Sequence, residues 1–271
     1  MAKNSNIEWC THTVNLWWGC SKVHTGCKNC YALVLANRFG GGIWGEKAPR
    51  KLIKSAFSDL DRYQKQAKKE GVKTTIFVGS MMDVLEEDKP MINHKGQPIK
   101  TRIEDLRQKL FIKIEKGFYP NLVFLFLTKR PENLKPILEK RRKDWIINGV
   151  PKNIWFGVSI SDQKTADKML MRILGNGIKH NLFISLEPQV GEVDLSGYLL
   201  DKEDLGEVLK QPIKWVIQGG ESGGNKRAFN LDWARSMREQ CKKAGVSYFF
   251  KQIDKVQEIP EHLLIRELPK F

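Results

Sequence analysis

The apolar run Leu122-Val123-Phe124-Leu125-Phe126-Leu127 is followed at once by Thr128-Lys129-Arg130-Pro131, and a helical pattern then extends from Glu132 to Lys143. Consecutive apolar residues of this kind are typical of a strand buried on both faces of a sheet. Polar and basic residues directly after such a strand are typical of the end at which parallel barrels carry their chemistry. This stretch therefore predicts one βα unit of a parallel α/β fold.

The same pattern recurs along the chain. Further strands are expected at 13–18, 74–78, 154–158, 182–186, 215–217 and 246–250. Further helices are expected at 103–116, 163–174 and 231–243. The last of these would begin at an N-cap, Asn230, and stop at Gly245. Alternation of this kind implies parallel strands joined by right-handed crossovers.

We therefore predict an α/β fold built as a partial or near-complete parallel (β/α) barrel of about six or seven βα units. The barrel is expected over residues 1–252, with residues 253–271 as a C-terminal tail that packs on it. The polar segment Glu86 to Lys100, which contains two prolines, is expected to be a loop over one end.

The composition is that of a folded chain, with 41% hydrophobic and 28% charged residues among 271. No stretch approaches the ~18 uncharged apolar residues of a membrane helix. The polar start, from Met1 to Asn6, lacks the apolar core of a signal peptide. We expect a cytoplasmic protein without a membrane partner. Lys and Arg number 46 against 31 Asp and Glu, which gives a formal charge of +15 and favours RNA or DNA as a partner.

Three of the five cysteines fall in the pattern Cys20-x6-Cys27-x2-Cys30. Thiolates are soft ligands that suit zinc or iron–sulfur clusters. His24 would complete a tetrahedral zinc site, whereas three cysteines alone would hold a [4Fe–4S] cluster with one iron free. The spacing leaves both open. The loop's position inside the first βα unit, with a helix beginning at Tyr31, favours the negatively charged cluster.

Cysteines on the loop after the first strand of a parallel barrel resemble those of the radical S-adenosylmethionine (SAM) enzymes. More narrowly, the chain resembles a phage-associated three-Cys-motif family of unknown function that is similar to radical SAM proteins. The motifs that carry this resemblance are Ile7-Glu8-Trp9, Trp18-Gly19-Cys20-Ser21-Lys22-Val23, Gly26-Cys27-Lys28-Asn29-Cys30-Tyr31-Ala32, Leu127-Thr128-Lys129-Arg130-Pro131, Ser185-Leu186-Glu187-Pro188, Gly219-Gly220-Glu221-Ser222-Gly223 and Phe249-Phe250-Lys251-Gln252. The usual radical SAM spacing is Cys-x3-Cys-x2-Cys, so the first gap here is longer.

The resemblance implies a [4Fe–4S] cluster on Cys20, Cys27 and Cys30, with SAM chelated at the free iron. One electron, from a donor such as ferredoxin or flavodoxin, would then cleave SAM to methionine and a 5′-deoxyadenosyl radical. The protein would orient the cofactor and shield the radical from water.

Cofactor contacts are expected at three strand exits, the first of which rests on the resemblance. Gly79, Ser80 and Asp83 stand where radical SAM proteins contact the methionine amino group, although Ser80 or Asp83 would equally suit a helix N-cap. Ser159 and Ser161 would bind the ribose or the carboxylate, with helix capping by Ser161 or Asp162 as the alternative. Glycines let a ligand approach the backbone closely. The glycines expected to do so are Gly219 and Gly220.

Three charged residues at the same mouth, Glu187, Glu221 and Arg130, are the catalytic candidates. Either carboxylate could hold a substrate amine, guanidinium or base edge. The alternative is a ring of salt bridges to Lys129, Arg130, Arg227 or Lys251, and both interpretations can hold together.

Among the remaining residues, Arg141, Arg142 and Lys143 could bind phosphate with Trp145 as a stacking ring. Trp17 is expected in the core, and Cys241 is expected to serve packing. Cys10 has no predicted role.

The function expected is a radical SAM enzyme that modifies or repairs a nucleic acid base or sugar, with methylation as one option. Two alternatives stay open: a zinc-containing nucleic-acid-binding protein without enzymatic activity, and a radical SAM enzyme that acts on a peptide or small molecule.

Overall fold

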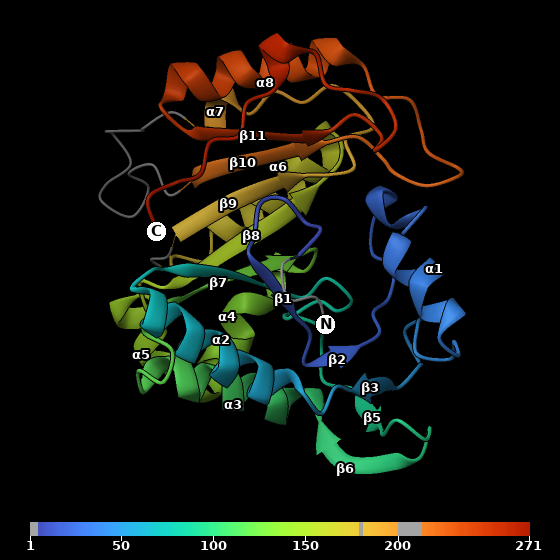
Figure 1. Cartoon of the computed structure of the whole chain (residues 1–271), viewed down its shortest axis with the longest axis vertical. Coiled ribbons are helices and arrows are strands. Elements are labelled where there is room, and N and C mark those ends of the chain that lie inside the picture. Colours follow the sequence, from blue (N-terminus) through green and yellow to red (C-terminus); the bar gives the residue numbers. More distant parts are fainter. Residues whose placement is uncertain (1–4, 179–180, 200–212) are drawn as a thin grey trace.

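The computed structural model describes residues 5–178, 181–199 and 213–271. Its main sheet holds seven parallel strands in the order β1-β4-β7-β8-β9-β10-β11. They are β1 (His12–Val14), β4 (Thr74–Val78), β7 (Leu122–Thr128), β8 (Ile154–Ile160), β9 (Asn181–Leu186), β10 (Ile213–Gly219) and β11 (Ser247–Gln252). The sheet curls into a half-barrel with β1 and β11 at its edges (Figure 1). The predicted α/β fold with a partial parallel barrel is confirmed.

Helices line the outer face of this sheet (Figure 1). The longer ones are α2 (Ala56–Glu70), α3 (Ile103–Glu115), α4 (Leu134–Arg141), α6 (Gln163–Leu174) and α8 (Leu231–Ala244), and the shorter ones are α5 (Lys143–Asn148) and α7 (Ser196–Leu199). Helix α1 (Tyr31–Arg38) lies apart, at the end to which the strand arrows point. Within the described ranges, none of the helices combines the length and the apolar character that crossing a bilayer requires.

The ends of α8 follow from its capping residues. The Asn230 side chain accepts a hydrogen bond from the Asp232 N–H, and Gly245 takes the left-handed φ of +65° at the other end. Glycine is favoured there because it has no Cβ to clash.

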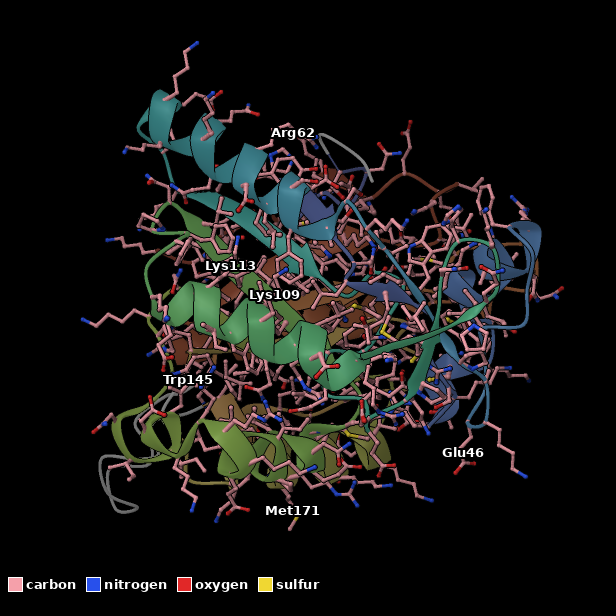
Figure 2. The ribbon with its side chains drawn as sticks, turned by 90° about the horizontal axis from the view of Figure 1, so that it is seen from below. Glu46, Arg62, Lys109, Lys113, Trp145 and Met171 are labelled. Carbon is pink, nitrogen blue, oxygen red and sulfur yellow. The ribbon has the colours of Figure 1, made fainter. Side chains whose placement is uncertain are left out.

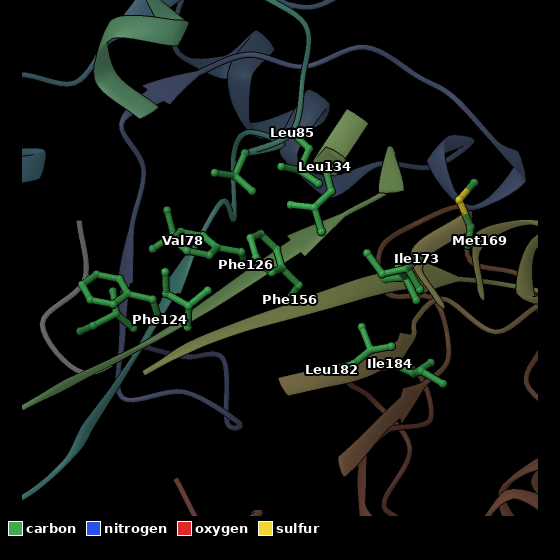
Figure 3. Packing of buried hydrophobic residues seen from close by; sticks show 14 of the residues in the cluster. Val78, Leu85, Phe124, Phe126, Leu134, Phe156, Met169, Ile173, Leu182 and Ile184 are labelled. Atoms are coloured by element: carbon green, nitrogen blue, oxygen red, sulfur yellow. The ribbon is translucent and has the colours of Figure 1, made fainter. Parts of the chain in front are cut away.

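Alternate residues of each strand enter two different cores, because successive side chains point to opposite faces. Val123 and Leu125 pack inside the half-barrel with Phe183 and Trp215. The intervening Phe124 and Phe126, together with Leu134 of α4, belong to the larger core between the sheet and the outer helices (Figure 3). Both faces are thus covered, as the continuous apolar strands predict.

The two ends of the chain pack on the half-barrel. Trp9 enters the inner core, with its ring centroid 4.6 Å from that of Phe77. At the other end, the Phe271 ring contacts Trp155 at 5.1 Å, and the indole N–H of Trp215 donates to the Glu267 carbonyl.

The expected first strand at 13–18 is two strands in different sheets. β1 ends at Val14, and β2 (Trp17–Trp18) pairs with β3 (Arg50–Leu52). Between them the Asn15 amide donates to Ser80 Oγ and accepts from the Met81 N–H, which turns the chain out of the main sheet. Trp17 is fully buried, as predicted.

The segment Glu86 to Lys100 is not a loop, contrary to the sequence prediction. It holds β5 (Pro90–Ile92) and most of β6 (Pro98–Arg102), an antiparallel pair that extends a second sheet in the order β2-β3-β5-β6. Prolines mark loops in sequence, but both of these stand at the first position of a strand, where a missing N–H is tolerated.

The basic segment after β7 also differs from the prediction. A 3-10 turn (Pro131–Asn133) precedes α4, and Arg142 interrupts the helix before α5. Trp145 is not a stacking ring for a ligand, because it is buried against Phe111 and its indole N–H donates to Glu115. A tryptophan at helical spacing from apolar residues usually belongs to the core.

We expect Gly157→Ala to lower the free energy of unfolding by about 1–3 kcal/mol, since overpacking a core costs this much. A Cβ at Gly157 would lie 2.3 Å from the Phe183 ring. Urea unfolding measures the loss. Gly197→Ala is the matched control, because open space surrounds that position, and Phe183→Leu should recover part of the loss. An unchanged urea midpoint in Gly157→Ala would contradict the packing described.

Candidate active site

The strands open at their carboxyl ends into a cavity of about 290 Å³. Its wall combines the cysteine loop, which we define as residues 20–30, with residues at or just beyond the carboxyl ends of six of the seven strands. The residues from these strand exits include Gly79 to Asp83, Leu127 to Arg130, Ser159, Ser185, Glu187, Pro188, Gly220 to Ser222, Lys251 and Lys255. The structure thus brings the polar strand ends to one place.

All three cysteines of the loop line this cavity, and none is in a disulfide. The loop makes a 3-10 turn at Thr25–Cys27. It ends at Cys30, which is the N-cap of α1 and makes no capping bond with its side chain. Burial raises the pKa of the Cys20 thiol to about 12, and the nearest cation is the Arg130 guanidinium, with Nη1 3.6 Å from the sulfur. Cys20 therefore has a cationic partner that would favour its thiolate when a metal binds.

Arg130 holds the start of the cysteine loop. Its Nη2 donates to the carbonyl and the hydroxyl of Ser21, at 3.0 and 2.7 Å. Its Nη1 donates to Asp83 Oδ2 at 2.9 Å, in a buried ion pair. Arg130, a candidate for catalysis by sequence, is placed here as a positioning residue.

Asp83 has little capacity left for a ligand. Oδ1 accepts from the Thr128 hydroxyl and the Leu85 N–H, and Oδ2 accepts from the Lys129 N–H and from Arg130. No described helix begins directly after Ser80 or Asp83, because the next elements are β5 and β6, so neither residue is a helix N-cap. That alternative from the sequence is wrong, because the Asp83 carboxylate turns toward the β7 exit instead.

A second buried pair supports the first. Glu86 accepts from Arg50 at 2.6 and 2.7 Å, and lies 3.6 Å from Arg130. Arg50 also donates to the carbonyls of Ile43, Gly45 and Ala48. A buried guanidinium needs this many acceptors to offset its loss of hydration.

The far end of the loop is tied to the β10 exit. The Asn29 amide donates to Glu221 Oε2 at 2.9 Å and to the Asn225 carbonyl at 2.8 Å. Glu221 also pairs with Arg227 at 2.7 Å. Burial alone would raise the pKa of Glu221, but the bonds from Arg227 and Asn29 outweigh it and hold this pKa below its usual value. Glu221 is thus an ionised positioning residue.

Two further bonds complete the attachment of the loop. The Thr25 hydroxyl donates to Asp162 Oδ2 at 3.0 Å, after β8, and the Tyr31 hydroxyl donates to the Ser80 carbonyl at 2.9 Å, after β4. Asp162 also caps α6 by accepting from the Thr165 N–H, as one of the sequence alternatives predicts.

The inner wall of the cavity combines apolar side chains with two serines, Ser159 and Ser185, and one ion pair. Trp9, Phe77 and Leu127 line it, and the Trp9 indole nitrogen is buried with no hydrogen-bond partner among the described residues. Lys251 donates to Glu187 Oε1 at 2.5 Å within this wall. The pairing of Glu187 with Lys251 and of Glu221 with Arg227 agrees with the salt-bridge alternative from the sequence.

The other predicted contacts divide between the cavity and its surroundings. Gly79, Ser80, Ser159 and Gly220 line the cavity, whereas Ser161 and Gly219 do not. Ser161 is buried behind the loop, where a Cβ on Gly26 would lie 2.2 Å from its hydroxyl oxygen. A Cβ on Gly220 would lie 2.0 Å from the Ile253 carbonyl oxygen. The glycine there lets the backbone at Ile253, just after β11, pass close by, and this packing explains the glycine as well as a ligand would.

His24 lies outside the lining of the cavity. Its Nδ1 accepts from the Gly26 N–H at 3.0 Å, and burial lowers its pKa to about 4. Within the described ranges, no three His, Cys, Asp or Glu side chains gather closely enough to hold a single metal ion. Cys10 and Cys241 are buried away from the cavity lining, and burial raises their pKa values to about 11 and about 12.

Several residues of the site had no predicted role, although four of the five named here lie in the motifs quoted above. Asn29, Tyr31 and Ser185 are examples, and Ser21 and Glu86 are others. Asn29 carries a signal in hindsight, because it lies between two cysteines and opposite a carboxylate. Glu86 carries none, because its partner Arg50 is distant in sequence.

Fold and cavity define an α/β half-barrel protein with a thiol-lined site at the carboxyl ends of its strands. A family model described as "Protein of unknown function (DUF5131)" matches residues 4–262, so the chain belongs to this family. No curated protein and no solved structure matches it. Membership of an uncharacterised family is confirmed, while the similarity to radical SAM enzymes and the phage association stay predictions.

We expect Asn29→Ala to speed alkylation of Cys27 and Cys30 in the metal-free protein by about three- to tenfold, because two hydrogen bonds that restrain the loop are lost. Mass spectrometry of iodoacetamide-treated protein measures this at each cysteine. Cys10 and Cys241 serve as internal controls, and Asn37→Ala, at an exposed position of α1, is the matched variant. Equal labelling rates in both variants would contradict the restraint.

Proposed function

We propose that this protein is a radical SAM enzyme that holds a [4Fe–4S] cluster on Cys20, Cys27 and Cys30 and modifies a nucleic acid. One observation carries the proposal: three free thiols on a single loop line one cavity at the carboxyl-end mouth of a parallel half-barrel. Active sites of parallel barrels lie at this end.

The donor set fits such a cluster. Each thiolate of a cubane cluster binds a different iron, so the cysteines need to face one space and need not converge on one point. A single zinc ion would need four ligands within about 2.3 Å. His24, the expected fourth ligand, lies outside the cavity lining; its Nδ1 accepts a bond from Gly26, and its buried Nε2 has no hydrogen-bond partner among the described residues. The residues therefore favour the cluster over zinc.

When bound, the cluster would supply the electron that cleaves SAM, after reduction by a donor such as ferredoxin or flavodoxin. The protein's own part is to bind, orient and exclude water. Trp9, Phe77 and Leu127 give the inner wall a dry surface, which protects a reactive intermediate from side reactions.

The polar groups of the wall divide into two sets. Asp83, Arg130 and Glu221 are occupied by bonds that hold the cysteine loop, so we assign them to positioning. Ser159 and the Glu187–Lys251 pair face the cavity with capacity left. The second carboxylate oxygen of Glu187 accepts no hydrogen bond from the described residues, and it can accept from a substrate amine or base edge. We propose Glu187 as the substrate-contacting carboxylate.

The substrate class rests on charge. The formal charge of +15 favours a polyanion, since basic proteins bind nucleic acids by neutralising phosphates. A peptide or small-molecule substrate is the outcome that the experiments below would reveal instead.

Anaerobically purified protein should be brown and contain about four irons and four sulfides per chain. Cys20→Ala, Cys27→Ala and Cys30→Ala should each lose most of the iron and the visible absorbance. Cys10→Ala and Cys241→Ala, which alter cysteines away from the cavity, should keep both. A colourless protein with one zinc would contradict the proposal and support the zinc alternative.

The reduced, reconstituted protein should convert SAM to 5′-deoxyadenosine or to a methylated product, and Cys27→Ala should not.

Nucleosides from cells with and without the gene should differ in at least one modified species by mass spectrometry. Glu187→Gln should lower the yield of the modified nucleoside by roughly tenfold or more, because a contact to the reacting unit is weakened. Turnover of SAM without any change in nucleosides would remove the nucleic-acid part alone.

A further inference from the structure

The carboxylates of the cavity are all neutralised by cations of the protein. Every carboxylate in the lining has a partner at 2.9 Å or less: Asp83 with Arg130, Glu187 with Lys251, and Glu221 with Arg227. Acidic groups therefore leave no net negative charge at the site.

The cations of the cavity are not balanced in the same way. Beyond Arg130 and Lys251, three lysines line it: Lys22, Lys129 and Lys255. None of the three forms an ion pair with any residue in the described part of the chain, and Lys22 donates only to the Lys28 carbonyl, at 3.3 Å. The mouth therefore carries three ammonium groups that have no acidic partner among the described residues.

These lysines come from three separate elements. Lys22 belongs to the cysteine loop, Lys129 follows β7, and Lys255 follows β11. Like charges repel, so collecting them around one opening disfavours the ligand-free fold and favours any anion that enters.

The backbone conformation at Lys255 also indicates that this lysine is held at the cavity by the fold. Its φ of +67° lies in the left-handed region, and among the described residues it is the one non-glycine residue there. Asp254 holds the turn by accepting from the N–H groups of Val256 and Gln257, and it pairs with Lys226 at 2.7 Å. The chain therefore adopts an uncommon conformation at the residue that places a lysine on the rim.

We propose that Lys22, Lys129 and Lys255 bind the phosphate groups of a nucleic-acid strand at the mouth of the half-barrel, an inference that relies on the proposed function for the choice of a nucleic acid. Phosphates on the strand would lie on the rim, across the cysteine loop and the exits of β7 and β11. The attached nucleotide would then face the Glu187–Lys251 wall.

The test compares two triple variants with equal loss of charge. The first is Lys22→Gln, Lys129→Gln and Lys255→Asn, since asparagine tolerates the left-handed region. The control is Lys65→Gln, Lys68→Gln and Lys69→Gln on the exposed face of α2, an outer helix that also carries Arg62 (Figure 2). Fluorescence anisotropy of labelled 12-nucleotide RNA and DNA single strands measures binding between 50 and 200 mM salt, with adenosine monophosphate and inorganic phosphate as competitors.

The rim variant should bind single strands roughly tenfold or more weakly, and the slope of log K against log salt should fall by about 2, since each phosphate contact on a single strand contributes about 0.7. The α2 variant should keep the slope of the wild type. Equal losses in both variants would overturn the proposal, because only total charge would then matter.

Three further outcomes separate this proposal from others. Efficient competition by adenosine monophosphate, with weak binding of strands, would assign the lysines to a small phosphorylated ligand and overturn the nucleic-acid strand. Unchanged strand binding with a loss of iron from the rim variant would assign them to charge compensation of the cluster. Lysine-dependent binding in a protein that never cleaves SAM would keep this inference and reject the proposed function.

Discussion

The buried pair of Asp83 and Arg130 is the interaction on which the site depends. It joins the exits of two neighbouring strands, β4 and β7. The Arg130 guanidinium also donates hydrogen bonds to Ser21 and Cys20 of the cysteine loop. A buried ion pair is tolerated only where its remaining hydrogen-bonding capacity is met. Here the carboxylate accepts four bonds, two of them from backbone N–H groups, so that its position is fixed by backbone that follows β4 and β7. The Asp83–Arg130 pair thus fixes the position of the first residues of the cysteine loop.

The loop needs such anchoring because it has little regular structure of its own. Between β2 and α1 it makes one 3-10 turn, and its cysteines have no disulfide partners. Bonds to the exits of β4, β7, β8 and β10 hold it instead, through Tyr31, Ser21, Thr25 and Asn29. Each bond contributes little alone, but together they oppose the entropy of a free loop. A loop attached at several strand ends can present three thiols to one cavity without distorting the sheet.

The parts of this architecture that the sequence predicts are those governed by local pattern. Strands such as Leu122–Thr128 are apolar on both faces, and helices such as α8 have visible caps, so each could be placed by periodicity and end signals. The split between β1 and β2 could not, because it is caused by Asn15, which bonds to residues more than sixty positions away. The sheet formed by β5 and β6 was hidden by prolines and polar residues that suit a strand start as well as a loop.

For the site, most of the residues that the sequence predicts line one cavity, but the sequence does not show which of them have hydrogen-bonding capacity left for a ligand. A polar residue at a strand exit can bind a ligand only through donors or acceptors that make no hydrogen bond within the fold. Which of them stay unused depends on the residue's tertiary partners. Asp83 bonds to Arg130, and Glu221 bonds to Asn29 and Arg227, so their acceptors are already used. Glu187 keeps an oxygen, and the rim lysines keep nearly all of their donors. The groups left over include Ser159 and one carboxylate oxygen on the inner wall and three ammonium groups on the rim. This change from a weakly charged wall to a basic rim gives an entering anion one preferred orientation.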